Sequence, residues 1–258
     1  MAQPVRQCIF CGQSGSSDEH IFAKWIGRTL RDELGPIPPT AKVVFCHRSA
    51  HPEAGIAMRE KTAKQPAYVT RAVCESCNNG WMALLEQRVQ PVLEPLIVGE
   101  PRTLAADDQE LLAFWATKTV LAFQTLEVPE TEWARSSDFA ELYKTQEPLA
   151  HSQVWLGAHA SREVGWQRAH SFEFPGQRAR EGVAGFGSTL LVGRAAFYVL
   201  VGYGGRVGLR LQYDAGFALT EIWPTRGERY WPPRLRLPDN TEQGLAELIR
   251  RNSVIKGI

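Results

Sequence analysis

Hydrophobic residues in the first third of the chain recur at helical spacing in two places. Between residues 20 and 34, apolar side chains stand at positions 22, 25, 26, 30 and 34, and a Gly-Pro pair directly after them ends the pattern. A second helix is predicted from about Asn78 to Val89. Pro91 and Pro95 are expected to bend or end it, because proline removes a helical hydrogen bond.

Two further helices are predicted in the middle of the chain. Asp107 or Asp108 caps the first, and the sequence LLAFWATKTVLAFQTL that follows is apolar around most of the helix, which predicts a position in the centre of the protein. A shorter helix is expected over SSDFAELYK, with Ser136 or Ser137 as its cap.

From about residue 151 the pattern changes to short β-like runs separated by glycine or proline. They are HSQVWLGAH, WQRAHSFEF, GSTLLVG, AAFYVLVGY, VGLRLQY and FALTEIW, and TEQGLAELIRRN then predicts a capped terminal helix. Two more strand candidates, KVVFC and AYVTRAV, lie between residues 41 and 73. The fold class predicted is α+β: a zinc-binding part over 1–100, a helical connection over 101–149, and a C-terminal antiparallel sheet with a terminal helix over 150–258.

The composition predicts a folded core and says little about binding partners. The 258 residues are 44% hydrophobic, with eight Trp and eleven Phe, and the net charge is +1, which argues neither for nor against nucleic acid. Between Arg162 and Arg236 the chain carries eleven Arg, no Lys and six acidic residues, a local surplus of +5. Arginine suits phosphate oxygens, so this segment is a candidate for binding nucleic acid, with a protein partner or a second copy of the chain as alternatives. The alternative explanation of this surplus is a preference for Arg over Lys throughout the chain, which contains 22 Arg and 7 Lys.

The N-terminal sequence and the hydropathy pattern predict a cytoplasmic protein. No run of about 18 apolar residues is present, so we expect no membrane helix. The first residues, MAQPVRQCIFCG, lack the apolar core of a signal peptide.

Four of the five cysteines form two CxxC pairs, Cys8 with Cys11 and Cys74 with Cys77. Four thiolates in two such pairs are the usual ligands of a structural Zn²⁺. The 62 residues between the pairs exceed the usual zinc-ribbon gap, but closure entropy grows only slowly with length. Unrelated buried thiols or a redox pair are the alternatives. Cys46, in the apolar run KVVFC, is expected to be a buried strand residue.

The ordered motifs CIFCG, DEHIF and VCESCNNGW resemble the HNH endonucleases of the four-cysteine, treble-clef kind, over about residues 6–90. The resemblance implies that His20 is a general base that activates water for attack on a phosphodiester. It also implies that Glu19 and Asn78 bind a catalytic Mg²⁺ or Mn²⁺ beside it.

Several positions depart from the pattern of that family. The usual middle Asn falls on Val69, a frequent Pro falls on Ala23, and a frequent basic residue falls on Trp81. Adjacent residues on an extended strand point to opposite faces, so the backbone has to twist for Glu19 and His20 to act together.

The sequence therefore predicts a metal-dependent endonuclease that hydrolyses nucleic acid, with DNA as the expected substrate. The alternative is a non-catalytic zinc scaffold that binds nucleic acid or a partner protein. The two differ in geometry: the nuclease needs Glu19, His20 and Asn78 around one divalent metal, whereas the scaffold needs only the four sulfurs.

Overall fold

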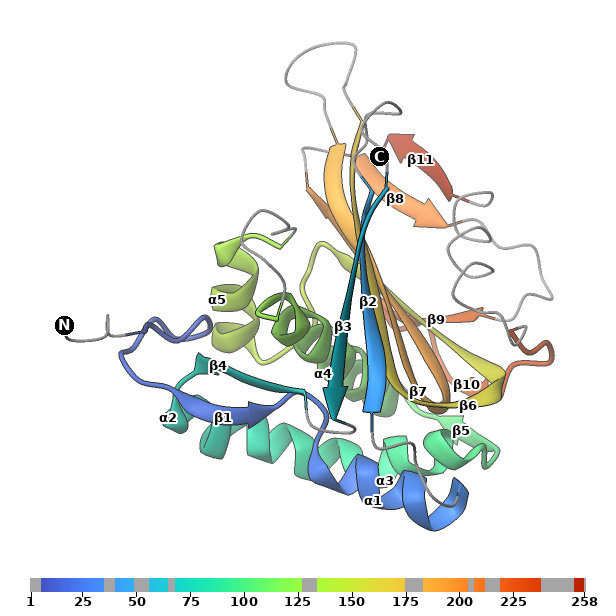
Figure 1. Ribbon diagram of the computed structural model, residues 1–258. Coiled ribbons are helices and arrows are strands. Elements are labelled where there is room, and N and C mark those ends of the chain that lie inside the picture. Colours follow the sequence, from blue (N-terminus) through green and yellow to red (C-terminus); the bar gives the residue numbers. More distant parts are fainter. Residues whose placement is uncertain are drawn as a thin grey trace.

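The computed structural model describes residues 6–34, 40–48, 56–64, 68–126, 134–174, 183–203, 207–211, 219–237 and 253–257. Helices and antiparallel strands are combined in it, which confirms the α+β class at this level (Figure 1). The terminal helix predicted over TEQGLAELIRRN lies outside the described residues.

The N-terminal part combines helices with the β1–β4 hairpin, an antiparallel strand pair whose two strands are separated in sequence by a helix and two further strands. Strand β1 (Ser17–His20) pairs antiparallel with β4 (Val69–Val73), and α1 (Lys24–Leu34) follows β1 as the hydrophobic spacing predicts. After β4, the chain enters α2 (Glu75–Cys77), the π-helical turn η1 (Asn78–Met82) and α3 (Ala83–Val98).

The helical run after the second CxxC is longer than predicted. It starts at Glu75 rather than near Asn78, has a kink at Gly80, whose φ of −94° and ψ of −112° are not helical, and continues through Pro91 and Pro95 to Val98. Both prolines stay within α3 because its inner face is packed in the core, which offsets the lost backbone hydrogen bonds. Gly99, with φ 94°, ends the helix and donates its N–H to the carbonyl of Pro95 at 3.0 Å.

Helices α4 (Ala106–Gln124) and α5 (Ser136–Thr145) appear where their sequence patterns place them, but their caps differ. The third residue of each helix is an aspartate whose carboxylate accepts the N–H of the residue preceding the helix. Asp108 accepts from Ala105 at 3.2 Å, and Asp138 accepts from Arg135 at 2.9 Å. Asp107, Asp108, Ser136 and Ser137 thus lie inside the helices rather than at their N-caps.

The C-terminal strands form a three-stranded antiparallel sheet in the order β7-β6-β9. Its members are β6 (Ser152–Phe174), β7 (Val183–Tyr203) and β9 (Leu219–Trp223). The runs HSQVWLGAH and WQRAHSFEF, predicted as two strands, form the single long strand β6. The runs GSTLLVG and AAFYVLVGY likewise form the single strand β7. Register shifts between Ala158 and Trp166 interrupt the pairing where the sequence suggested a break.

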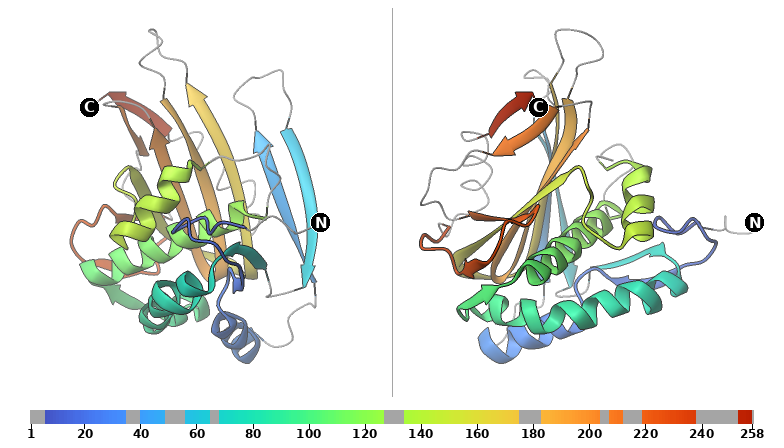
Figure 2. Two further views of the ribbon diagram at one scale, coloured as in Figure 1. Left: turned by 90° about the vertical axis from the view of Figure 1, so that its left-hand side faces the viewer. Right: turned by 180° about the vertical axis from the view of Figure 1, so that it is seen from behind.

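Three two-stranded pairs complete the strand set. They are β2 (Thr40–Arg48) with β3 (Ile56–Lys64), β5 (Arg102–Leu104) with β10 (Arg229–Trp231), and β8 (Val207–Leu211) with β11 (Ser253–Gly257). The β3 segment, which reads as a polar insert in the sequence, was not predicted as a strand. Strand β2 lies beside β6 (Figure 2).

Helix α4 forms the middle layer. It packs against β6, β7 and β9 on one side and against α3 on the other, as both figures show (Figures 1 and 2). From Leu112 to Phe123 every side chain of α4 is buried, which confirms the central position predicted from its apolar circumference. One cluster of buried residues runs from the N-terminal part with its four cysteines through α4 into the sheet. No helix in the described part of the chain is long and apolar enough to cross a membrane.

Candidate zinc centre and the hairpin beside it

Both CxxC pairs adopt the same backbone turn. The N–H of the residue after the second cysteine donates to the carbonyl of the first cysteine, from Gly12 to Cys8 at 2.9 Å and from Asn78 to Cys74 at 3.0 Å. Gly12 makes its turn with φ 72°, a conformation that favours glycine, whereas Asn78 continues into the helical run. The N–H of Ile9 donates to the carbonyl of Ala72 at 3.0 Å, so the first pair is tied directly to the end of β4.

The four cysteine sulfurs gather in one place. All four Sγ atoms lie within 4.8 Å of one another, and those of Cys11 and Cys74 are 3.5 Å apart. A tetrahedron with Zn–S bonds of about 2.3 Å has S–S edges of about 3.8 Å, so the spacing suits one zinc ion. Four cysteines that could hold a metal ion such as zinc are therefore together, as the sequence predicted for Cys8, Cys11, Cys74 and Cys77.

The backbone around Cys8 favours its thiolate form. Burial raises the pKa of Cys8, but backbone N–H groups of Cys11, Cys74 and Phe10 lower it to about 7. Burial raises the pKa values of Cys11 and Cys77. The backbone thus favours ionisation of Cys8, and a bound metal ion would favour deprotonation of its thiol ligands.

Aromatic packing covers the cysteine cluster on the side of α4 and α5. Phe10, between the first two cysteines, lies edge-on to Trp81 at 5.3 Å and to Phe139 of α5 at 5.7 Å between ring centroids. Trp81 stacks on Phe114 of α4 at 5.8 Å. Trp81 stands where the resembled family often has a basic residue, and its role here is to join the cluster to the core.

The β1–β4 hairpin has one exposed and one buried face. Glu19 pairs with Thr70 and His20 with Val69, and a register shift lies between Ser17 and Glu19. Because side chains alternate along a strand, Asp18 and His20 share the face opposite to that of Glu19. Asp18 and Arg71 form an exposed ion pair at 2.8 Å, and His20 is half-buried. Glu19 and His20 themselves pair with consecutive residues of β4, so their side chains alternate across the strand.

Glu19 points into the protein. It is 5% exposed, and its Oε1 lies 3.9 Å from the ammonium group of Lys118, a fully buried residue of α4. Its partner across the hairpin, Thr70, forms a hydroxyl hydrogen bond of 2.6 Å with Thr125, just after α4. Burial raises the pKa of Glu19 to about 7, although the charge of Lys118 lowers it and that of Glu86 raises it further.

The residues predicted for a catalytic divalent metal do not fit one shared site. Glu19 faces Lys118, His20 lies on the other face of the strand, and the amide of Asn78 donates to the Ser17 hydroxyl at 3.0 Å. Within the described ranges, the four cysteines are the only group in which three or more ligand atoms of Cys, His, Asp or Glu lie close enough to share a metal ion. Val69, at the position of the family's middle Asn, is the direct cross-strand neighbour of His20 and offers it no polar side chain.

The arginine surplus between residues 162 and 236 is described only in part. Arg226 lies 3.5 Å from Glu221, and the guanidinium of Arg229 donates to the carbonyl of Glu221 at 3.4 Å. The side chains of Glu163, Glu173 and Glu181, the acidic partners weighed for this surplus, lie outside the described residues. Its role in binding nucleic acid stays a prediction.

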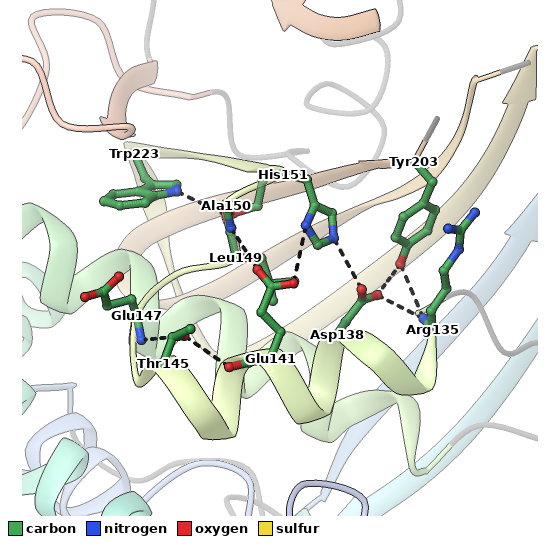
Figure 3. A network of polar contacts seen from close by, with 11 residues as sticks. Arg135, Asp138, Glu141, Thr145, Glu147, Leu149, Ala150, His151, Tyr203 and Trp223 are labelled. Atoms are coloured by element: carbon green, nitrogen blue, oxygen red, sulfur yellow. Dashed lines mark hydrogen bonds and ion pairs between the residues drawn. The ribbon is translucent and has the colours of Figure 1, made fainter. Parts of the chain in front are cut away.

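A polar network that sequence reasoning missed joins α5 to the sheet (Figure 3). The carboxylate of Asp138, 1% exposed, accepts hydrogen bonds from the Tyr203 hydroxyl and the Arg135 N–H and contacts His151 Nε2 at 3.2 Å. The Arg135 guanidinium lies 3.8 Å from the centroid of the Tyr203 ring. Glu141 lies 3.8 Å from the other nitrogen of His151. No pattern of residue spacing in the sequence predicts this network, because its members come from three separate segments.

The network predicts a pH-dependent contribution to stability. The hydrogen bond to Asp138 raises the pKa of His151, burial of the ring lowers it, and the charges of Asp138 and Glu141 raise it further while Arg135 lowers it. With a folded pKa above the unfolded value of about 6.5, the contribution is fully present below that value and is lost as pH rises through the folded pKa. Replacing His151 with Gln should cost about 1 kcal/mol of unfolding free energy at low pH and less at high pH.

Urea unfolding of wild type and His151→Gln between pH 5.5 and 8.5 measures this difference. A difference between the two proteins that stays constant across the range would contradict a protonated His151 in the folded state.

Comparisons with protein-family models, with curated proteins and with solved structures find no match for this chain. The functional argument therefore rests on the cysteine cluster, on the hairpin that it adjoins, and on the chemistry of their side chains.

Proposed function

We propose that this chain is an HNH-type endonuclease with a structural zinc ion, and that His20 is its general base. The observation that supports it best is the order of elements around the cysteine cluster. The first CxxC leads into a strand that ends at His20, and the paired strand leads into the second CxxC at the start of a long helix. This strand pair and helix, with α1, β2 and β3 inserted between the two strands, correspond to the β–β–α order that the resemblance to HNH endonucleases implies.

The outer face of the hairpin offers two groups that suit phosphodiester hydrolysis. His20 carries a base, and Arg71 stands two residues along β4 from Val69, the cross-strand partner of His20. The Arg71 side chain is 68% exposed. A phosphate that draws Arg71 away from Asp18 would gain a planar, bidentate partner for its oxygens. Negative charge that develops on those oxygens during the reaction would be stabilised by the same guanidinium.

The reaction that we propose is an in-line hydrolysis. The neutral imidazole of His20 takes a proton from water as the water oxygen bonds to phosphorus, and the bond from phosphorus to the leaving sugar oxygen breaks. The leaving oxygen then takes a proton from solvent. General-base catalysis of this kind contributes typically about 10²–10⁴-fold to a rate.

A catalytic Mg²⁺ or Mn²⁺ held by Glu19 does not fit the geometry of the hairpin, so no step is derived through it. A requirement for one of these ions stays a prediction, tested by assay in the presence of each ion and of a chelator too weak to remove the zinc.

A non-catalytic zinc scaffold is the second candidate, and one observation favours it. The carboxylate that should hold the catalytic metal is buried next to an ammonium group instead, at 3.9 Å. A scaffold would bind nucleic acid or a partner protein through the exposed face of the hairpin without cleaving it. DNA remains the expected nucleic acid in either case.

Cleavage of labelled DNA and RNA by wild type and His20→Ala separates the two candidates. The nuclease predicts products with wild type alone, and the scaffold predicts binding without products from either protein.

A further inference from the structure

A buried lysine lies between two carboxylates at the junction of β1, α3 and α4. The ammonium of Lys118, with an exposed fraction of 0%, is 2.8 Å from Glu86 Oε1 on α3 and 3.9 Å from Glu19 Oε1 on β1. The indole N–H of Trp115 also donates to Glu86 Oε1, at 3.1 Å. Within the described residues, Glu86 Oε2 is buried without a hydrogen-bond partner.

Lys118 is held as a cation by this arrangement. Burial lowers the pKa of Lys118, but the charges of Glu86 and Glu19 and the hydrogen bond to Glu86 outweigh it, and the pKa is raised. An ammonium group without these carboxylates would be costly to bury, and so would the carboxylates without the ammonium. The three side chains therefore depend on one another.

We propose that the Lys118 ammonium takes the place of a divalent cation beside Glu19, so that Glu19 anchors β1 to α3 and α4 and does not bind a catalytic metal. The part of this inference that concerns catalysis rests on the proposed nuclease function. It follows that any divalent ion that supports cleavage binds on the outer face of the hairpin with the substrate.

Charge balance and strand alternation both support the inference. Two carboxylates that face one small site form a pair that a divalent cation would bind, and here one buried ammonium already occupies that position between them. Since Glu19 and His20 alternate on β1, a metal at Glu19 would lie across the strand from the general base. A metal there would also have to displace a buried cation and leave it unpaired, which is costly.

The inference is tested by measuring Mn²⁺ binding to the zinc-loaded full chain with electron paramagnetic resonance. Wild type and Glu19→Gln are expected to bind Mn²⁺ equally, because Glu19 is not a ligand. Lys118→Met should gain a Mn²⁺ site between the two free carboxylates. Loss of a wild-type Mn²⁺ site in Glu19→Gln would overturn the inference, and so would a Lys118→Met protein that folds but gains no site.

Thermal unfolding supplies the second measurement, which does not depend on Mn²⁺. Lys118→Met should lower the unfolding midpoint by about 10 °C, because the buried carboxylate of Glu19 and the partly buried carboxylate of Glu86 lose their cation. The triple variant with Glu19→Gln, Glu86→Gln and Lys118→Met should recover most of that loss, even if the single variant fails to fold. A triple variant no more stable than the single one would contradict the mutual dependence of the three charges.

Cleavage separates this inference from the proposed function. If wild type cleaves nucleic acid, Glu19→Gln should retain most of that activity, far from the loss of about 10²-fold or more expected for the general base. A loss in Glu19→Gln as large as that in His20→Ala, at unchanged stability, would overturn the inference. If wild type cleaves nothing, the proposed function fails, and the Mn²⁺ and unfolding measurements still decide the role of Lys118.

Discussion

Replacing Cys74 with Ser is expected to release the zinc and destabilise the whole N-terminal part. The four sulfurs lie within 4.8 Å of one another, and the metal would join a turn at residues 8–11 to the start of the helical run at Glu75. Structural zinc sites contribute about 10–16 kcal/mol in small zinc-finger peptides, so losing one thiolate should cost on the order of 5 kcal/mol here. That is a large fraction of the stability of most proteins.

The effect should spread beyond the cysteines because their surroundings belong to the main core. Phe10 packs on Trp81 and Phe139, and Trp81 packs on Phe114 of α4. Loosening the first CxxC turn would expose these rings and weaken the contact of α5 with the cluster.

Metal analysis and thermal unfolding measure this effect. Wild type purified without added metal should contain about one zinc per chain, and Cys74→Ser should contain much less and unfold at a lower temperature. Cys46→Ser is the matched control, because Cys46 lies on β2 outside the two CxxC pairs and should leave the zinc content unchanged. A wild-type chain that folds stably without zinc would contradict the structural role of the metal.

The features predicted correctly from the sequence are those encoded by neighbouring residues. CxxC spacing places two sulfurs on one turn, and the spacing of apolar residues in α1 and α4 fixes their helices. Alternation along a strand already required a twist for Glu19 and His20 to act together, and the two residues pair in regular register with Thr70 and Val69, which places their side chains on opposite faces.

The features that were missed depend on contacts between distant segments. α3 continues through Pro91 and Pro95 because tertiary packing outweighs the local cost of proline. The contacts of Lys118 with Glu19 and Glu86, and those of His151 with Asp138, join residues whose proximity no local pattern predicts. The resemblance implies a metal ligand at Glu19, but a motif of residue types carries no information on the buried Lys118 that faces this carboxylate.

Replacing His20 with Ala is expected to abolish cleavage while leaving the fold intact. His20 is half-buried on the face of β1 opposite to that of Glu19, so its removal should disturb neither the cysteine cluster nor the Lys118 contacts. A general base contributes on the order of 10²–10⁴-fold, so the loss should lie in that range. His151→Gln is the matched control, because it removes a histidine more than a hundred positions away in sequence and should leave cleavage unchanged.

The most direct test of the proposed function is one cleavage measurement on zinc-loaded wild type, His20→Ala and His151→Gln. Labelled single- and double-stranded DNA and RNA are incubated with each protein, with Mg²⁺, with Mn²⁺ and without either ion, after each protein has been shown to have equal zinc content and to be fully folded at the assay pH and temperature. The account predicts products from wild type and His151→Gln and a loss of at least about 10²-fold in His20→Ala. Equal cleavage by His20→Ala, or no cleavage by wild type under any of these conditions, would contradict it.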